Sequence, residues 1–230
     1  MNWKQVINKP NFVWSSATKN VVSRLDKNDP FASSLLLHNA IFKLDASAYK
    51  DFLEYIGSQI LPFKSIAEYG CGNGSLLYYF KNLYNAKVFG CDISTDLINS
   101  CKEVMPDSIF CSDTNFTISD DSVDYCLSNS VFQYFDSEDY AATVIKEMQR
   151  ISIKGIFITD IKSADRELDF KKLQATRQNL TIEQLEEKYS TTPLRFYTKD
   201  FFAQFGNITV LSMPNTYPDA TLGSFSVLIK

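Results

Sequence analysis

The sequence predicts one α/β domain over residues 1–230, built on a mostly parallel β-sheet with helices on both faces. Three observations support this prediction. The 230 residues can bury one substantial core, and no stretch is typical of a linker between domains. Between positions 64 and 160, short apolar runs that end at turn residues alternate with amphipathic runs. Such alternation is typical of parallel strands connected by covering helices, as in doubly wound folds.

About sixty residues with helical character precede the first expected strand. One helical run begins at Ser15, and two more cover residues 32–44 and 46–61. The Asp29-Pro30 and Leu61-Pro62 peptide bonds break these runs. The following strands and helices are expected at 65–69, 74–84, 86–91, 95–104, 108–111, 123–128, 138–151 and 154–160. Ser137 is a suitable cap for the helix at 138–151, whose apolar residues repeat at helical spacing.

The last seventy residues change in character. Residues 161–197 are expected to form a helical insertion with mixed charges, in which Thr181 and Gln184 have capping-box spacing. Most of these charges are expected on solvated helix surfaces, yet the insertion follows a strand whose carboxyl end borders the ligand crevice. Within 198–230, a short helix and two strand-like runs at 207–213 and 224–229 are expected, with no helix between the two strands.

Composition indicates an ordered globular protein. Hydrophobic residues make up 45% of the chain, and charged or polar residues interrupt each apolar run before membrane-spanning length. The first residues begin no apolar signal region, so we expect a soluble, cytoplasmic protein, as a monomer or homodimer. The net charge of −4 offers no basic field for phosphate backbones, which favours a small-molecule partner over nucleic acid or a membrane.

The cysteines and the one histidine give no metal-binding pattern. The five cysteines are odd in number and lack C-x-x-C spacing, so we expect neither a disulfide framework nor a thiolate zinc site. One histidine and no clustered acidic ligands predict no catalytic metal, with magnesium on loop carboxylates as the open alternative.

The stretch from Glu68 to Gly74 is the most informative, because it places three glycines between an expected strand and an expected helix. Glycines permit positive φ and let a ligand approach the exposed amino end of the helix. Asp92 ends the next strand, about twenty residues on, where a carboxylate can hold ribose hydroxyls. A dinucleotide fingerprint, G-x-G-x-x-G, would place its third glycine at position 75, but this chain has Ser75 there and Gly74 one residue earlier. A plain turn, with Asp92 as the cap of the following helix, is the alternative interpretation.

These residues resemble the class I, Rossmann-like, S-adenosylmethionine-dependent methyltransferases of small-molecule type, whose first motif is acidic-x-Gly-x-Gly-x-Gly. The resemblance covers positions 64 to 160. It implies S-adenosyl-L-methionine as cofactor, S-adenosyl-L-homocysteine as product, a seven-stranded sheet ending in an antiparallel hairpin, and residues 1–63 as a helical lid. Ser112 and Asp113 match the third motif, which binds adenine, and the strand that ends near Asn129 matches the fourth, beside the transferred methyl group. The implied cofactor-binding residues are Glu68, Gly70, Cys71, Gly72, Gly74, Asp92, Ile93, Ser112, Asp113 and Asn129.

Two residues are candidates for a catalytic proton acceptor. As a histidine, His38 could accept a proton near neutral pH. The apolar run around it is equally typical of a packed, hydrogen-bonded residue. Asp160 ends the expected strand at 154–160, where a turn cap is the alternative. The residues expected to contact the acceptor are Trp14, Gln133, Tyr134, Arg195, Tyr197 and Tyr217, and for each of them packing or surface exposure is the competing interpretation.

We therefore expect methyl transfer to a small molecule, at a hydroxyl or acidic oxygen of a sugar, phosphorylated metabolite or natural-product intermediate. Methyl transfer depends mainly on holding the two reactants in line and excluding water. The alternatives are a nicotinamide-dependent oxidoreductase and a non-catalytic cofactor-binding subunit. A nucleic-acid methyltransferase is less favoured, since base-methylating relatives carry Asn or Asp followed by Pro-Pro and an aromatic, where this chain has residues 129–132, Asn-Ser-Val-Phe.

Overall fold

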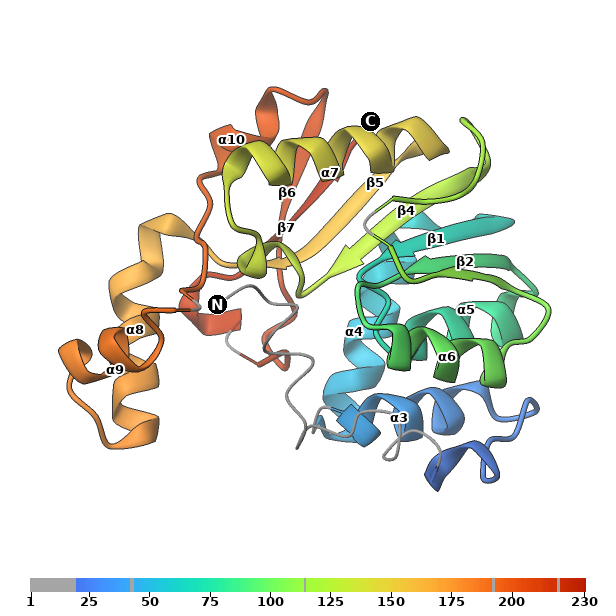
Figure 1. Ribbon diagram of the computed structural model, residues 1–230, viewed down its shortest axis with the longest axis horizontal. Helices are drawn as coiled ribbons and strands as arrows, with labels where there is room; N and C mark the ends of the chain where they lie inside the picture. Colours follow the sequence, from blue (N-terminus) through green and yellow to red (C-terminus); the bar gives the residue numbers. More distant parts are fainter. Residues whose placement is uncertain (1–19, 42–43, 114, 192, 219) are drawn as a thin grey trace.

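The computed structural model describes residues 20–41, 44–113, 115–191, 193–218 and 220–230. Its centre is a seven-stranded sheet in the order β3-β2-β1-β4-β5-β7-β6 (Figure 1). The first five strands are parallel, and β7 runs antiparallel to both β5 and β6. The fold class predicted from the sequence is thus confirmed. The strands are β1 (Ser65–Tyr69), β2 (Lys87–Cys91), β3 (Ile109–Cys111), β4 (Val123–Asn129), β5 (Ser152–Ile161), β6 (Ile208–Ser212) and β7 (Phe225–Ile229).

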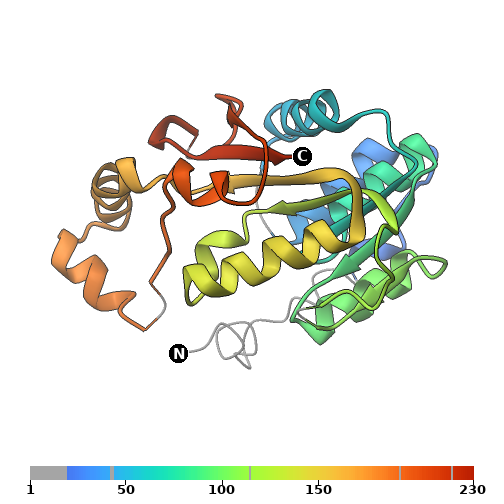
Figure 2. The ribbon, with the colours of Figure 1, turned by 90° about the horizontal axis from the view of Figure 1, so that it is seen from above.

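Alternate residues of each strand enter two hydrophobic clusters on opposite faces of the sheet. Ile66 of β1 belongs to one cluster and Ala67 to the other, as the period of two in a strand requires. Helices α4 (Ala46–Ile60), α5 (Ser75–Tyr84) and α6 (Thr95–Val104) contribute to the first cluster, and α7 (Glu138–Ile151) and α10 (Lys199–Ala203) to the second. Figure 2 shows the sheet between α4 and α7.

The amino-terminal helices differ from the predicted lid. Tyr49, Phe52 and Ile56 of α4 are fully buried against the sheet, so α4 is a layer of the core. Helix α3 (Pro30–Ile41) instead packs on α5 beside the glycine turn. Asn73 Nδ2 donates to the Leu37 carbonyl oxygen at 2.7 Å, which joins α3 to that turn. Of the described part of residues 1–63, α3 is therefore the helix that borders the predicted cofactor site.

The predicted insertion is a pair of helices, α8 (Glu167–Gln178) and α9 (Ile182–Lys188), preceded by the short η2 turn (Ala164–Arg166). Figure 1 shows this pair projecting from the body of the molecule beyond β5. The capping box predicted at Thr181 is present, with Thr181 Oγ1 accepting from Gln184 N and Gln184 Oε1 accepting from Thr181 N. The pair thus follows the carboxyl end of β5 along the chain, and its role beside the acceptor stays a prediction.

Candidate active site

The glycine turn after β1 has the backbone that its sequence predicts. Gly70, Gly72 and Gly74 have φ of 74°, 54° and 77°, in the left-handed region. A Cβ at Gly70 would lie 2.4 Å from Val131 Cγ2, whereas a Cβ at Gly72 would meet nothing within 4 Å. The turn therefore packs tightly against the β4 loop on one side and offers open space above Gly72, which is where a ligand could approach the backbone.

We predict that the two glycines respond differently to alanine. Gly70→Ala forces both a left-handed alanine and a clash with Val131, so it should lower stability and cofactor affinity together. Gly72→Ala should lower the free energy of unfolding by only about 1–2 kcal/mol, because alanine disfavours the left-handed backbone. Its methyl group should nevertheless fill the space that a ligand would use and so weaken cofactor binding. Urea unfolding and calorimetry with S-adenosylhomocysteine measure the two effects. A Gly72→Ala protein that binds as tightly as wild type would contradict this assignment.

Asp92 connects the glycine turn to the end of β2. Its Oδ2 accepts from Gly72 N at 2.9 Å and its Oδ1 accepts from Ser94 N at 2.9 Å. Burial raises the pKa of Asp92, and these two backbone donors act in the opposite direction. Each carboxylate oxygen has further acceptor capacity, so the side chain is oriented for a diol beside the glycine turn.

Glu68 supplies a buried carboxylate at the end of β1. It is 3% exposed, and its Oε2 has no hydrogen-bond partner among the described residues. Burial and the charge of Asp92 raise the pKa of Glu68 well above its usual value. A buried acceptor without a donor is costly unless a ligand satisfies it. The open space at Gly72, the Asp92 diol site and this acceptor together fit the ribose and amino groups of the cofactor that the resemblance implies.

The remaining residues predicted to bind the cofactor lie around the same turn. Cys71 is buried beneath it, and Ile93 follows Asp92 and is half-buried. Ser112 and Asp113 are exposed just after β3, and Asp92 N donates to the Cys111 carbonyl oxygen at 3.2 Å. The structure thus brings the ends of β1, β2 and β3 together, while the adenine contact expected of Asp113 stays a prediction.

A second polar cluster lies at the carboxyl ends of β4 and β5. Ser130 Oγ donates to Asp160 Oδ2 at 2.6 Å, and Lys162 Nζ donates to Asp160 Oδ1 at 2.9 Å and to Ser224 Oγ at 3.3 Å. Ser130 and Asp160 have φ of 57° and 54°, a strained backbone of the kind that collects at functional sites. Sequence reasoning selected Asp160 but missed Ser130 and Lys162, although both lie within two residues of a predicted strand end.

Two tyrosines extend this cluster. The Tyr217 hydroxyl lies 3.1 Å from Ser130 Oγ. Tyr134 follows Gln133, whose side chain is 4% exposed and whose Oε1 has no partner among the described residues. Burial raises the pKa of both phenols, so both stay neutral at pH 7. The cluster therefore presents hydroxyl and amide groups and a neutralised ion pair.

Two residues predicted to contact the acceptor have structural roles instead. Tyr197 is fully buried, and its hydroxyl donates to the Phe132 carbonyl oxygen at 2.9 Å. Arg195 Nε donates to the Phe135 carbonyl oxygen at 3.0 Å, and its guanidinium also donates to the carbonyl of Asp136. Both side chains are thus engaged by the loop after β4, which they hold in place. Trp14, another of the six residues predicted to contact the acceptor, lies outside the described residues.

His38 lies on α3, one residue after the Leu37 carbonyl that contacts the glycine turn. Its ring centroid is 4.8 Å from that of Tyr49, a packed arrangement. Burial lowers the pKa of His38 to about 4, which makes its imidazole a weaker proton acceptor than an ordinary histidine. The geometry thus favours the packing role over the role of a general base.

The lowered pKa of His38 predicts an acid-sensitive fold. An unfolded chain protonates histidine near pH 6.5, whereas the folded chain resists protonation down to about pH 4. The free energy of unfolding should therefore decrease as the pH is lowered from about 6.5 to about 4, with a loss of about 2 kcal/mol from His38 at pH 4.5. Above pH 7 His38 should have no such effect. We expect His38→Gln to lose less stability than wild type between pH 7.5 and pH 4.5 in urea unfolding. Equal losses in the two proteins would contradict a buried neutral His38.

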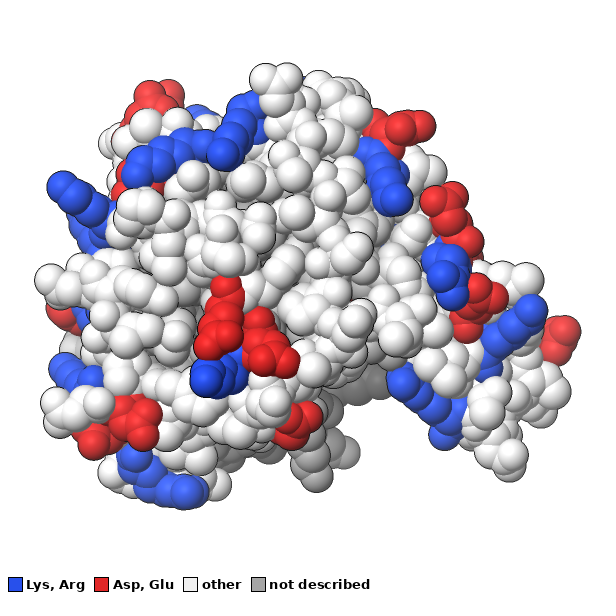
Figure 3. Space-filling model, turned by 180° about the vertical axis from the view of Figure 1, so that it is seen from behind, with Lys and Arg blue, Asp and Glu red and all other residues white. Residues whose placement is uncertain are grey.

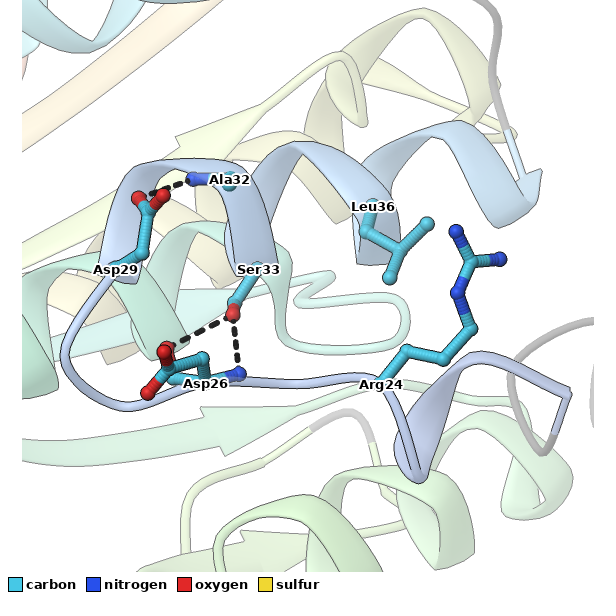
Figure 4. Close-up of a pocket in the computed structure, with 6 residues that line it drawn as sticks. All are labelled: Arg24, Asp26, Asp29, Ala32, Ser33 and Leu36. Carbon is cyan, nitrogen blue, oxygen red and sulfur yellow. Dashed lines mark hydrogen bonds between the residues drawn. The ribbon is translucent and has the colours of Figure 1, made fainter.

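A shallow cavity beside α3 is separate from both clusters (Figure 4). Its polar lining is largely paired within itself, since Ser33 Oγ bonds the Asp26 backbone and Asp29 Oδ1 accepts from Ala32 N. In the part of the chain that the structure describes, no group of three or more His, Cys, Asp or Glu could hold a metal ion.

No helix within the described residues is long and apolar enough to span a membrane.

Comparison with known proteins finds a family model described as a methyltransferase domain, which matches residues 67–159. The tRNA (carboxymethyluridine(34)-5-O)-methyltransferase ALKBH8 of Mus musculus is 33% identical over 96 residues, which are 41% of this chain and 14% of that protein. The same enzyme of Xenopus tropicalis is 30% identical over 90 residues, 39% of this chain and 14% of that protein. The chain thus matches only a small part of these relatives.

Solved structures share the fold over most of the chain. A chain of the complex between the Haloferax volcanii Trm112 methyltransferase activator and a methyltransferase has a TM-score of 0.59 at 12% identity, covering 94% of this chain and 95% of that one. The plantazolicin methyltransferase BpumL, solved with S-adenosylhomocysteine, has a TM-score of 0.56 at 18% identity, covering 99% and 93%. At these identities the likeness concerns the fold alone.

Proposed function

We propose that this chain is an S-adenosylmethionine-dependent methyltransferase that transfers the methyl group to an oxygen atom of a small polar acceptor. The acceptor class is a hydroxyl or acidic oxygen of a sugar, phosphorylated metabolite or natural-product intermediate. The observation that supports this proposal is the cluster of hydroxyl and amide groups at the ends of β4 and β5, around Ser130, Tyr217 and Gln133. Its hydroxyl donors and the unpaired Gln133 Oε1 suit an oxygen-rich substrate.

The cofactor would be held by the ends of β1, β2 and β3. When bound, S-adenosylmethionine supplies an electrophilic methyl group on a sulfonium. Asp92 would accept hydrogen bonds from the two ribose hydroxyls, and Glu68 would accept from a donor group that enters the buried space near it. Gly72 leaves room for close backbone approach. Because Val131 packs on Gly70, the loop that carries Gln133 is fixed relative to this turn.

The acceptor would be oriented by the β4 and β5 cluster. Gln133 Oε1 would accept a hydrogen bond from an acceptor hydroxyl, and Tyr134 and Tyr217 would act as neutral donors. Ser130 and Lys162 hold Asp160 in place, so Asp160 is positioned within the hydrogen-bonded chain that reaches Tyr217. Transfer requires a near-attack geometry more than strong acid–base groups, which is what such a rigid cluster provides.

A second candidate is methylation of a tRNA nucleoside. The curated relatives with 30–33% identity are named for transfer to an oxygen of carboxymethyluridine in tRNA. Against it, the chain has a net charge of −4, and the basic groups Arg150, Lys171 and Arg166 pair with neighbouring carboxylates. Figure 3 shows basic and acidic side chains interspersed on the face of the molecule that it draws, without a broad basic surface there. Phosphate backbones are usually bound by such surfaces, so the small-molecule acceptor is preferred.

An assay with labelled methyl donor tests this proposal. The protein is incubated with a low-mass metabolite extract and, separately, with bulk tRNA, and Asp92→Ala serves as the inactive control. We expect label in the low-mass fraction, none with the control, and an alkali-labile product if the acceptor is a carboxylate. Label in tRNA alone would replace the proposal by the second candidate. Binding of S-adenosylhomocysteine without transfer to either pool would indicate a non-catalytic cofactor-binding subunit.

A further inference from the structure

Two cysteines lie side by side beneath the cofactor site. Cys91 ends β2 and Cys111 ends β3, and the two residues are direct partners in the parallel register of these strands. Neighbouring strands lie about 4.8 Å apart, which is within the Cα separation that a disulfide allows. Their side chains share one face of the sheet and enter the same hydrophobic cluster.

The two thiols differ in access and acidity. Cys91 is fully buried and burial raises its pKa, whereas Cys111 is half-buried. The neighbouring Cys91 side chain lowers the pKa of Cys111 to about 7, which favours the thiolate form of Cys111. An accessible thiolate with a second thiol held against it is the arrangement of a reactive and a resolving cysteine.

We propose that Cys91 and Cys111 form a modification site, in which a peroxide converts the two thiols to a disulfide that weakens cofactor binding. The Cys111 thiolate attacks one peroxide oxygen, the O–O bond breaks, and a proton is taken up as water leaves. The Cys91 thiol then attacks the Cys111 sulfenic acid, the S–S bond forms, and the S–O bond breaks with loss of a second water. In total, two thiols are oxidised and one hydrogen peroxide is reduced to two waters.

The position of the pair connects this modification to the cofactor. Cys91 precedes Asp92, and its carbonyl oxygen accepts from Gly70 N and Cys71 N at 2.8 and 3.0 Å. Asp92 N donates to the Cys111 carbonyl oxygen. A disulfide fixes its sulfurs about 2.05 Å apart within a narrow range of torsion angles, so its formation constrains the ends of β2 and β3 that position Asp92. The disulfide itself is independent of the proposed function, whereas its effect on affinity rests on the proposed binding role of Asp92.

A neighbouring pair provides an internal comparison. Cys71 and Cys101 are neighbours beneath the glycine turn, where their Sγ atoms donate to the Gly72 carbonyl oxygen at 3.8 and 3.3 Å. Both of these residues are buried, and burial raises the pKa of Cys71 well above its usual value. Peroxide should therefore oxidise the Cys91 and Cys111 pair first, because a buried neutral thiol reacts slowly.

Peptide mapping and calorimetry test this inference on the full chain. The protein is treated with hydrogen peroxide, the remaining thiols are alkylated, and digestion followed by mass spectrometry locates the disulfide. Calorimetry with S-adenosylhomocysteine is run on reduced, oxidised and dithiothreitol-treated protein. We expect a peptide linking Cys91 to Cys111, at least tenfold weaker binding after oxidation, and recovery with dithiothreitol.

Variants separate this pair from the others. Cys111→Ser should form no such disulfide and keep its affinity after peroxide, and Cys91→Ser should stop at the sulfenic acid of Cys111, which dimedone traps. Cys126→Ser, a change elsewhere in the core, should still form the disulfide. Absence of the linked peptide would overturn the modification site, and a linked peptide with unchanged affinity would overturn its effect on cofactor binding. Weak binding already in the reduced protein would instead point to a failure of the proposed cofactor site.

Discussion

Asp92→Ala is expected to lower the affinity for S-adenosylhomocysteine by roughly 100-fold or more, since it removes two charge-assisted hydrogen bonds of about 1.5–3 kcal/mol each. The carboxylate also accepts from Gly72 N and Ser94 N, so its loss releases the glycine turn from the start of α6. We expect an accompanying loss of about 1–3 kcal/mol in stability. Calorimetry at a temperature where circular dichroism shows the variant folded measures the affinity alone.

Two further variants make this test specific. Asp92→Asn keeps one carbonyl oxygen and the side-chain volume, so its affinity should lie between those of wild type and Asp92→Ala. Asp96→Asn changes an exposed carboxylate in the first turn of α6 and should bind as wild type does. If Asp92→Ala binds within threefold of wild type, the ribose site lies elsewhere and the match to the methyltransferase motif is misleading at this position.

Lys162→Met is expected to destabilise the protein by about 3–5 kcal/mol, because it leaves a buried carboxylate without its cation. Asp160 and Lys162 are 5% and 7% exposed, with 2.9 Å between Oδ1 and Nζ, and the Lys162 Nζ also lies over the Phe170 ring at 5.4 Å from its centroid. The double change Asp160→Asn with Lys162→Met should cost less than the sum of the single changes. Urea unfolding of the four proteins measures this coupling.

The control for this pair is a lysine on the insertion. Lys171 pairs with Glu167 and Glu186 at 2.8 Å each near the surface, so Lys171→Met should cost no more than about 1 kcal/mol. Because Asp160, Ser224 and the Phe170 ring, which Lys162 contacts, lie outside the proposed cofactor site, Lys162→Met should keep its affinity for S-adenosylhomocysteine within about threefold while turnover falls. Wild-type stability in Lys162→Met would show that Asp160 is not held as a buried anion.

The cofactor half of the site could be predicted because its parts are close in sequence. The turn from Glu68 to Gly74 requires positive φ at its glycines, and only a short strand and helix are needed to express that requirement. Asp92 follows at the next parallel strand, and parallel strands bring their carboxyl ends to one edge. Hydrophobic periodicity and turn residues therefore predicted the succession of strands and helices in the cofactor half and the place of the glycine turn.

The acceptor half required the tertiary structure, because its contacts join distant residues. Ser130 meets Tyr217 across 87 residues, and Lys162 meets Ser224 across 62. Contacts between distant residues also explain why the sequence did not predict the burial of Tyr197 under the loop after β4. The same reason applies to the packing of α4 in the core. Local patterns report which face of an element is apolar, whereas partners in space depend on how the whole sheet and its helices pack. The sequence by itself thus determined the fold class and pointed by resemblance to the methyl donor, and only the packed fold decided which polar groups meet beside the proposed donor site.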